Sequence, residues 1–235
     1  AAAGMNWVVD QTYDEGPKLA WHLRRPDDDP LKAEALYRQI LSESPEHDLA
    51  AWSLLALARI KHLVPVGSAP DTAAVRRAYQ ECIDRFPGHA SAEEALIYQQ
   101  STYVSTFDLS DAKSAAEKLE KFLAERPQSP FVSPACILLS QCYQLLNEPE
   151  KRLAARIRAL QTEEHDPLSP QADKALNYWT IATIAEFEAG DFKTARTYYQ
   201  LLIDEYLNDI RRYGAKKALL RMDEMEARLR AEASR

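Results

Sequence analysis

The sequence predicts an all-α protein, an α-solenoid in which helical hairpins stack on one another. The first reason is a helical pattern that recurs at intervals of about 40 residues, within the range typical of repeat proteins. The skeleton of a full copy is a small residue, an aromatic residue four positions later, an apolar residue three beyond that, and a helix stop five residues further on. The copies begin at Ala33, Val75, Ala115, Ala155 and Ala195. The second reason is composition: six glycines in 235 residues, with long segments of Ala, Leu, Glu, Arg and Lys, favour helices over strands.

Proline and glycine divide the first half of the chain into helices. After a short irregular helix, Pro17 suits the first turn of a helix that we expect to end before the loop 26–30. The next helix ends before Pro45, and a longer loop at 64–71 separates the two helices that follow. Asp71 is expected to cap the helix after that loop, because an aspartate side chain accepts a hydrogen bond from an unpaired backbone N–H there.

Similar signals divide the second half. Asp111 is expected to cap a helix at 112–126, Asn147 begins a short turn between helices, and Gly190–Asp191 forms a tight turn. The copy that begins at Ala155 is the weakest, because arginines dilute its apolar face. The expected helices span 17–25, 31–44, 48–63, 72–86, 90–105, 112–126, 134–146, 150–164, 170–189, 193–206 and 210–232.

Paired in order, these helices form one repeat domain at 5–235, because each unit of a solenoid packs on its neighbours. The expected hairpins span 5–45, 48–87, 90–127, 134–167 and 170–207, followed by a capping helix at 210–232. Residues 1–4 resemble a cloning remnant, so Met5 is the expected native start.

Charge and hydropathy narrow the classes of function. A net charge of −7 disfavours nucleic-acid binding, which depends largely on neutralising phosphates with basic residues. No run of about 18 apolar residues could span a membrane, and the first residues lack the basic and apolar regions of a signal peptide. We therefore favour a cytoplasmic protein, with a periplasmic location as the alternative if an export signal has been removed.

No group of residues indicates catalysis or metal binding. The chain has no glycine-rich phosphate loop, no nucleophile elbow and no pair of histidines at ligand spacing. Cys136 and Cys142 lie six residues apart on one expected helix and therefore point to different faces. Together with Cys82 they are expected to be small buried helix residues. We expect no enzyme activity, no cofactor and no metal.

The segment that ends in the strongest copy resembles the tetratricopeptide repeat (TPR). Its matching residues are Trp179, Ala182, Thr183, the turn Gly190-Asp191-Phe192, and then Ala195, Tyr199 and Leu202. Leu202 is larger than the family's usual alanine, and Leu207 stands where the family has proline. The resemblance covers about residues 17–230, with a period about six residues longer than the usual 34. The longer period and the helix endings are similar to those of bacterial cell-envelope proteins of the BamD and YbgF types.

The resemblance implies a right-handed superhelix whose concave groove, lined by the first helix of each hairpin, binds a peptide or helix of another protein. Aligned on Trp52, Leu96, Cys136 and Trp179, the implied groove residues are Ser53, Leu57, Ile97, Ser101, Ile137, Gln141, Gln144, Asn177, Thr180 and Ile184. The Lys/Asn clamp with which some TPR proteins hold a terminal carboxylate is absent from these positions. The alternative is that Ile97, Ile137 and Ile184 only pack between units.

A basic cluster near the C-terminus suggests a second contact surface. It consists of Arg211, Arg212, Lys216, Lys217 and Arg221. The cluster either docks an acidic partner or simply balances the neighbouring acidic side chains.

The sequence as a whole predicts a non-catalytic protein-interaction scaffold, a monomer or weak homo-oligomer. One alternative is a cell-envelope assembly factor that works with lipoproteins. The other is a structural protein that self-associates through the capping helix or through the segment 7–9.

Overall fold

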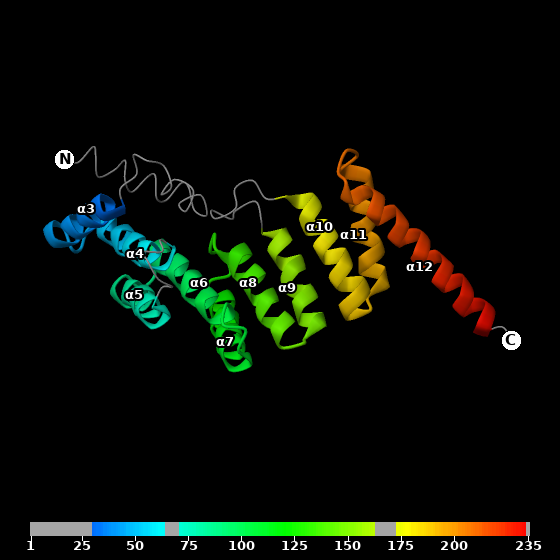
Figure 1. The fold of residues 1–235 in the computed structure, drawn as a ribbon, viewed down its shortest axis with the longest axis horizontal. Helices are drawn as coiled ribbons and strands as arrows, with labels where there is room; N and C mark the ends of the chain where they lie inside the picture. Colours follow the sequence, from blue (N-terminus) through cyan, green and yellow to red (C-terminus); the bar gives the residue numbers. More distant parts are fainter. Residues whose placement is uncertain (1–29, 64–70, 163–172, 234–235) are drawn as a thin grey trace. The chain divides into compact units, whose positions relative to one another are not determined.

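Every regular element that the computed structural model describes, in residues 30–63, 71–162 and 173–233, is a helix (Figure 1). The predicted all-α fold is therefore confirmed, whereas the helices expected before residue 30 lie outside the described residues. The helices are α3 Pro30–Glu43, α4 Asp48–Leu63, α5 Thr72–Arg85, α6 Ala90–Val104, α7 Leu109–Glu125, α8 Val132–Leu145, α9 Pro149–Gln161, α10 Lys174–Ile184, the π-helical turn η3 Ala185–Ala189, α11 Phe192–Glu205 and α12 Arg211–Ala233.

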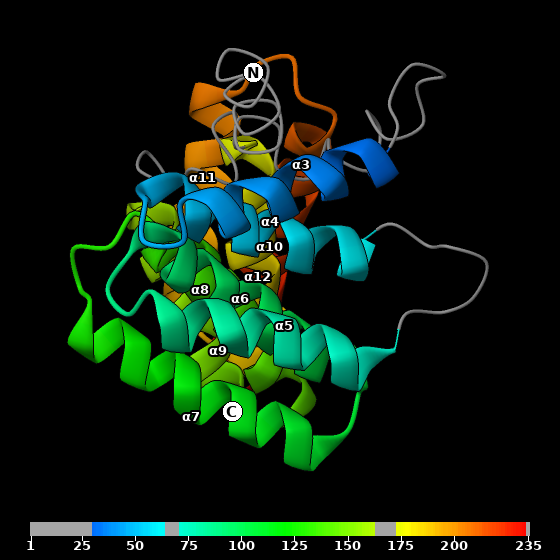
Figure 2. The ribbon, with the colours of Figure 1, turned by 90° about the vertical axis from the view of Figure 1, so that its left-hand side faces the viewer.

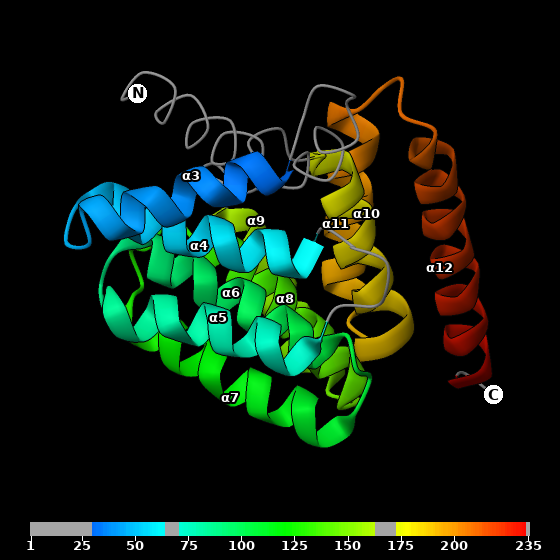
Figure 3. The same ribbon diagram turned by 60° about the vertical axis from the view of Figure 1, so that its left-hand side comes forward.

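The chain divides into two compact units, with the boundary between Asp111 and Ala112. In unit 1, α3 packs on α4, α4 on α5 and α5 on α6, so that successive helices form successive layers (Figure 2). In unit 2, α8 packs on α9, α9 on α10, and α10, α11 and α12 lie side by side (Figure 3). Packing in sequence order within each unit is the arrangement of an α-solenoid.

The repeated positions face the interior of each unit. Tyr37, Tyr79, Leu119 and Tyr199, which occupy the second position of four copies, are buried. The copy in α9 has Ala159 at that position, and Ala159 is buried as well. These side chains are buried because they fall on the same face of each helix as the small residue four positions earlier.

Aspartates begin three of the helices as N-caps. The carboxylates of Asp71, Asp173 and Asp191 each accept a hydrogen bond from the backbone N–H three residues later. The predicted cap at Asp71 is confirmed, and Gly190 in the turn before α11 has φ 66°, a conformation that favours glycine.

Two predicted helix starts differ from the observed ones by three residues or more. Helix α7 begins at Leu109 because Asp108 accepts hydrogen bonds from the backbone N–H groups of Ser110 and Asp111, which places Asp111 within the first turn. The helix expected to begin at 170 begins at Lys174 instead, after its cap Asp173.

Gly214 allows α12 to approach α10 closely. A Cβ atom at this position would lie 2.8 Å from Cη2 of Trp179, whose ring packs edge-on against Tyr199. Gly214→Ala is therefore expected to destabilise the protein by about 1–2 kcal/mol, because overpacking outweighs the better helix propensity of alanine. In a Trp179→Leu background the same substitution should stabilise, by roughly 0.5–1 kcal/mol. Urea unfolding of the wild type, the two single variants and the double variant tests this, and a Gly214→Ala effect that Trp179→Leu leaves unchanged would contradict it.

Candidate protein-interaction surfaces

Three of the ten residues implied to line the groove are buried in the structure. Ser53 donates a hydrogen bond from its hydroxyl to the carbonyl oxygen of Leu49, 2.6 Å away, within α4. Ile184 belongs to the core of unit 2, and Ile97 of α6 is 6% exposed. These side chains pack in the interior, as the alternative interpretation proposed for Ile97 and Ile184.

In unit 2, α8 carries the most accessible part of the groove set. Ile137 is half-buried and Gln141 and Gln144 are exposed. Their spacing of four and then three residues places them on one side of the helix. The opposite side of α8 presents Cys136 and Tyr143 to the interior. The structure thus brings these three predicted residues together in one row.

The remaining four groove residues are half-buried, and three of them make hydrogen bonds within the protein. Ser101 donates to the carbonyl oxygen of Tyr98, and Thr180 donates to that of Leu176. The side-chain oxygen of Asn177 accepts a hydrogen bond from Arg156 of α9 at 3.2 Å. Leu57 packs against the core of unit 1 around Tyr37.

A cavity of about 320 Å³ lies between α7, α8 and α9 in unit 2. Its apolar lining consists of Leu123, Ala124, Cys136, Leu139, Ala154 and Ala155, and its polar lining of Glu120, Tyr143, Lys151 and Arg158. None of these residues belongs to the predicted groove. The cavity faces the side of α8 opposite the Ile137–Gln144 row, and it involves α9, the weakest copy of the repeat.

The polar side chains of this cavity make hydrogen bonds or ion pairs within unit 2. The Tyr143 hydroxyl donates a hydrogen bond to Glu120. Burial and, to a smaller extent, this hydrogen bond raise the pKa of Tyr143. Lys151 forms an ion pair with Glu148 at 2.6 Å. Arg158 donates to the carbonyl oxygen of Leu123 at 3.2 Å. The cavity can therefore hold an apolar side chain beside a guanidinium group, an arrangement that the sequence indicated only by an arginine on an apolar face.

The cysteine thiols are not activated as nucleophiles. Burial raises the pKa of Cys136, in the cavity wall, and those of Cys82 and Cys142 to about 11 each, so the thiols are protonated at neutral pH. In residues 30–63, 71–162 and 173–233 no three His, Cys, Asp or Glu side chains are placed to hold a metal ion.

In unit 1, a buried ion pair joins two first helices of neighbouring hairpins. Arg59 of α4 donates to Glu94 of α6 at 3.1 Å, and the two side chains are 3% and 2% exposed. Arg59 also lies over the ring of Tyr98, which stacks on Tyr79. Burial raises the pKa of Glu94 to about 7, against a smaller lowering by Arg59. The two residues are far apart in the sequence, which offers no signal for this contact.

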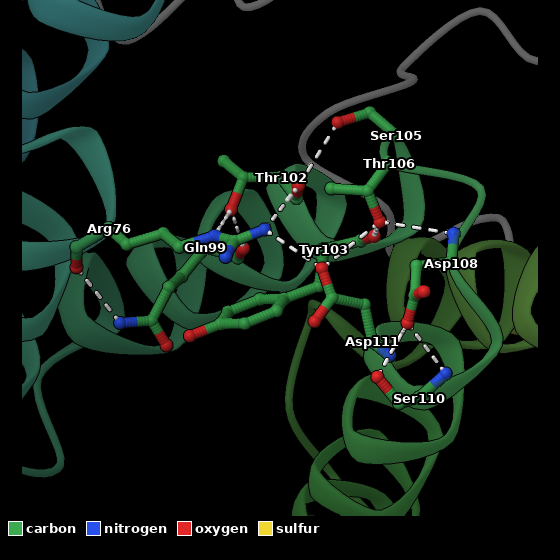
Figure 4. A network of polar contacts seen from close by, with 9 residues as sticks. All are labelled: Arg76, Gln99, Thr102, Tyr103, Ser105, Thr106, Asp108, Ser110 and Asp111. Atoms are coloured by element: carbon green, nitrogen blue, oxygen red, sulfur yellow. Dashed lines mark hydrogen bonds and ion pairs between the residues drawn. The ribbon is translucent and has the colours of Figure 1, made fainter. Parts of the chain in front are cut away.

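A second polar network holds the end of α6 to α5 and to the start of α7 (Figure 4). The Arg76 guanidinium lies 3.6 Å from the centre of the Tyr103 ring, donates to the hydroxyl and carbonyl oxygens of Thr102, and approaches Asp111 at 3.4 Å. Gln99 donates to the carbonyl oxygen of Arg76 at 3.1 Å. Because Nε and Nη2 of Arg76 bind groups of unit 1, we interpret this network as structural.

The predicted basic cluster on α12 is largely engaged within the protein. Arg211 pairs with Asp173 and Asp209, Arg212 donates to the carbonyl oxygen of Ile203, and Arg221 pairs with the buried Glu186. Lys216 and Lys217 remain exposed. Arg211 thus balances the neighbouring Asp209, whereas Arg221 pairs with Glu186, which is 35 residues earlier in the sequence.

Residues 178–206, from α10 to the end of α11, match the family model of the tetratricopeptide repeat. The match covers the hairpin in which Tyr199 packs on Trp179, the segment from which the sequence resemblance was drawn. No curated protein and no solved structure matches the chain, so the similarity to the BamD and YbgF types stays a prediction. Among residues 30–63, 71–162 and 173–233, no helix is long and apolar enough to cross a membrane.

Proposed function

We propose that this TPR protein is a non-catalytic scaffold that holds a peptide or helix of another protein against α8. TPR repeats generally mediate protein–protein interactions, and residues 178–206 match the TPR family model. The observation that carries the proposal is the row formed by Ile137, Gln141 and Gln144 on the first helix of a hairpin. This row is accessible, whereas the side chains on the opposite side of α8 are buried in the core.

The chemistry of the row suits a polypeptide ligand. An exposed glutamine amide donates and accepts hydrogen bonds, so Gln141 and Gln144 can pair with backbone groups or polar side chains of a bound segment. Ile137 offers apolar surface on the same side of α8, where an apolar anchor residue of the segment can pack. Asn177 and Thr180 of α10 supply further polar groups in the same unit.

Site-specific photocrosslinking tests this proposal. A benzophenone amino acid at Gln141 should capture a partner protein from an extract of the native organism. The same group at Glu117, which is exposed on α7, is the control and should not. Ile137→Asp should abolish capture at 141 while the far-UV circular dichroism spectrum is unchanged. Equal capture at 141 and 117, or capture that survives Ile137→Asp, would refute binding at this row.

A further inference from the structure

Helix α12 exposes apolar side chains on the face that points away from α11. Ala215, Ala218 and Met222 face the core of unit 2, whereas Tyr213 and Leu220 are 65% and 63% exposed. At 100° per residue, Tyr213, Leu220 and the exposed Ala227 fall on one stripe, roughly opposite the buried residues. We refer to Tyr213, Leu220 and Ala227 as the outer stripe.

The charges that flank the outer stripe change sign at Leu220. Lys216 and Lys217 lie four and three residues before Leu220, and Asp223 and Glu224 lie three and four residues after it. The two lysines lie six to eight residues from the two acids, which is too far for ion pairs within the helix, because such pairs join residues three or four apart. Asp223 pairs with Arg196 of α11, but Lys216, Lys217 and Glu224 make no ion pair within the described part of the chain.

We infer that the outer stripe binds the same stripe of a second copy of this chain, with the two α12 helices antiparallel. A two-fold axis at Leu220 places Leu220 against Leu220 of the second copy and Tyr213 against Ala227 of the second copy. It also places Lys217 beside Glu224 of the second copy, on both sides of the axis. A parallel arrangement would instead place lysine beside lysine, so the charge pattern favours the antiparallel pair.

The contact is expected to be weak. From residue 213 to residue 227 the helix is only about 20 Å long, so the pair buries less than the roughly 1,600 Å² of a standard stable interface. Lys217 already lies 4.7 Å from the centre of the Tyr213 ring, and this cation–π contact holds its charge at the edge of the outer stripe. We expect a dissociation constant in the micromolar range or above.

Charge exchange tests the arrangement by sedimentation velocity, from about 1 µM to about 1 mM, which brackets such an affinity. The sedimentation coefficient of the wild type should rise with concentration. Lys217→Glu and Glu224→Lys should each weaken association about ten-fold or more, and the double variant should restore it. Lys113→Glu, an exposed change of the same charge on α7, is the matched control and should have no effect.

Disulfide trapping tests the direction of the pair. When Tyr213→Cys and Ala227→Cys proteins are mixed under mild oxidation, an antiparallel pair gives the mixed disulfide between positions 213 and 227. A parallel pair gives only disulfides between like positions, 213 with 213 and 227 with 227. The native cysteines are buried and do not interfere. A wild type that stays monomeric over the whole concentration range overturns the proposal. So does a dimer that is insensitive to both charge changes, because its contact lies elsewhere.

Discussion

Tyr199→Ala is expected to lower the free energy of unfolding by about 3–5 kcal/mol, the range for removing a large buried aromatic side chain. Tyr199 is 1% exposed and lies at the centre of the core of unit 2, where it contacts Trp179 edge-on at 5.5 Å. Its hydroxyl donates to the buried carboxylate of Glu186 at 2.9 Å. The alanine variant loses the ring and leaves that carboxylate with Arg221 as its remaining partner.

Tyr199→Phe is the matched control for this prediction. It keeps the ring and removes only the hydrogen bond to Glu186, so we expect a loss of about 0.5–1.5 kcal/mol. Urea unfolding followed by circular dichroism gives both values. If alanine and phenylalanine at 199 reduce stability equally, the ring is not packed as the structure describes.

Glu94→Leu is expected to destabilise the protein by a similar amount, about 3–5 kcal/mol, because it leaves the charge of Arg59 buried without its carboxylate partner. The ion pair is among the least exposed groups of unit 1. Adding Arg59→Met should recover most of the loss, since an apolar pair of similar size needs no charge compensation. A double variant that is as unstable as Glu94→Leu would show that shape, not charge, dominates at this site.

The same carboxyl group predicts a pH dependence. The pKa of Glu94 in the folded protein is about 7, above its ordinary value of 4.5, so the folded chain holds this proton more tightly than the unfolded chain. The stabilisation from protonated Glu94 is complete below pH 4.5 and is lost as the pH rises through about 7. As the pH rises across this window, the free energy of unfolding of the wild type should therefore decrease relative to that of Glu94→Gln. A difference between the two proteins that does not change with pH would contradict the raised pKa.

The repeated skeleton was predictable because its information is local. A small residue followed four positions later by a tyrosine or leucine marks one face of a helix, and the buried Tyr37, Tyr79 and Tyr199 follow directly from it. The cap at Asp71 was predictable for the same reason. Asp111 was mistaken for a cap because both Asp108 and Asp111 precede an apolar run, and only the backbone path selects Asp108.

The accessible residues were harder to predict because helices of a repeat bury more than one face. Ile97 and Ile184 fall at positions that the resemblance to the TPR assigns to a groove, yet both side chains are buried. By contrast, Leu139 of α8 lines a cavity, because small alanines on α7 and α9 leave space beside it. Neither outcome can be read from the helix on which the residue lies.

The sequence alone determined the class of this protein: an all-α chain of stacked hairpins with a period near 40 residues. Helix periodicity and capping depend on residues a few positions apart, so both can be read directly from the sequence. Only the tertiary structure decided which faces stay open, that Arg59 meets Glu94, and that α12 turns Tyr213 and Leu220 outward. These features depend on the distance and rotation between helices, which follow from the packing of side chains far apart in the chain.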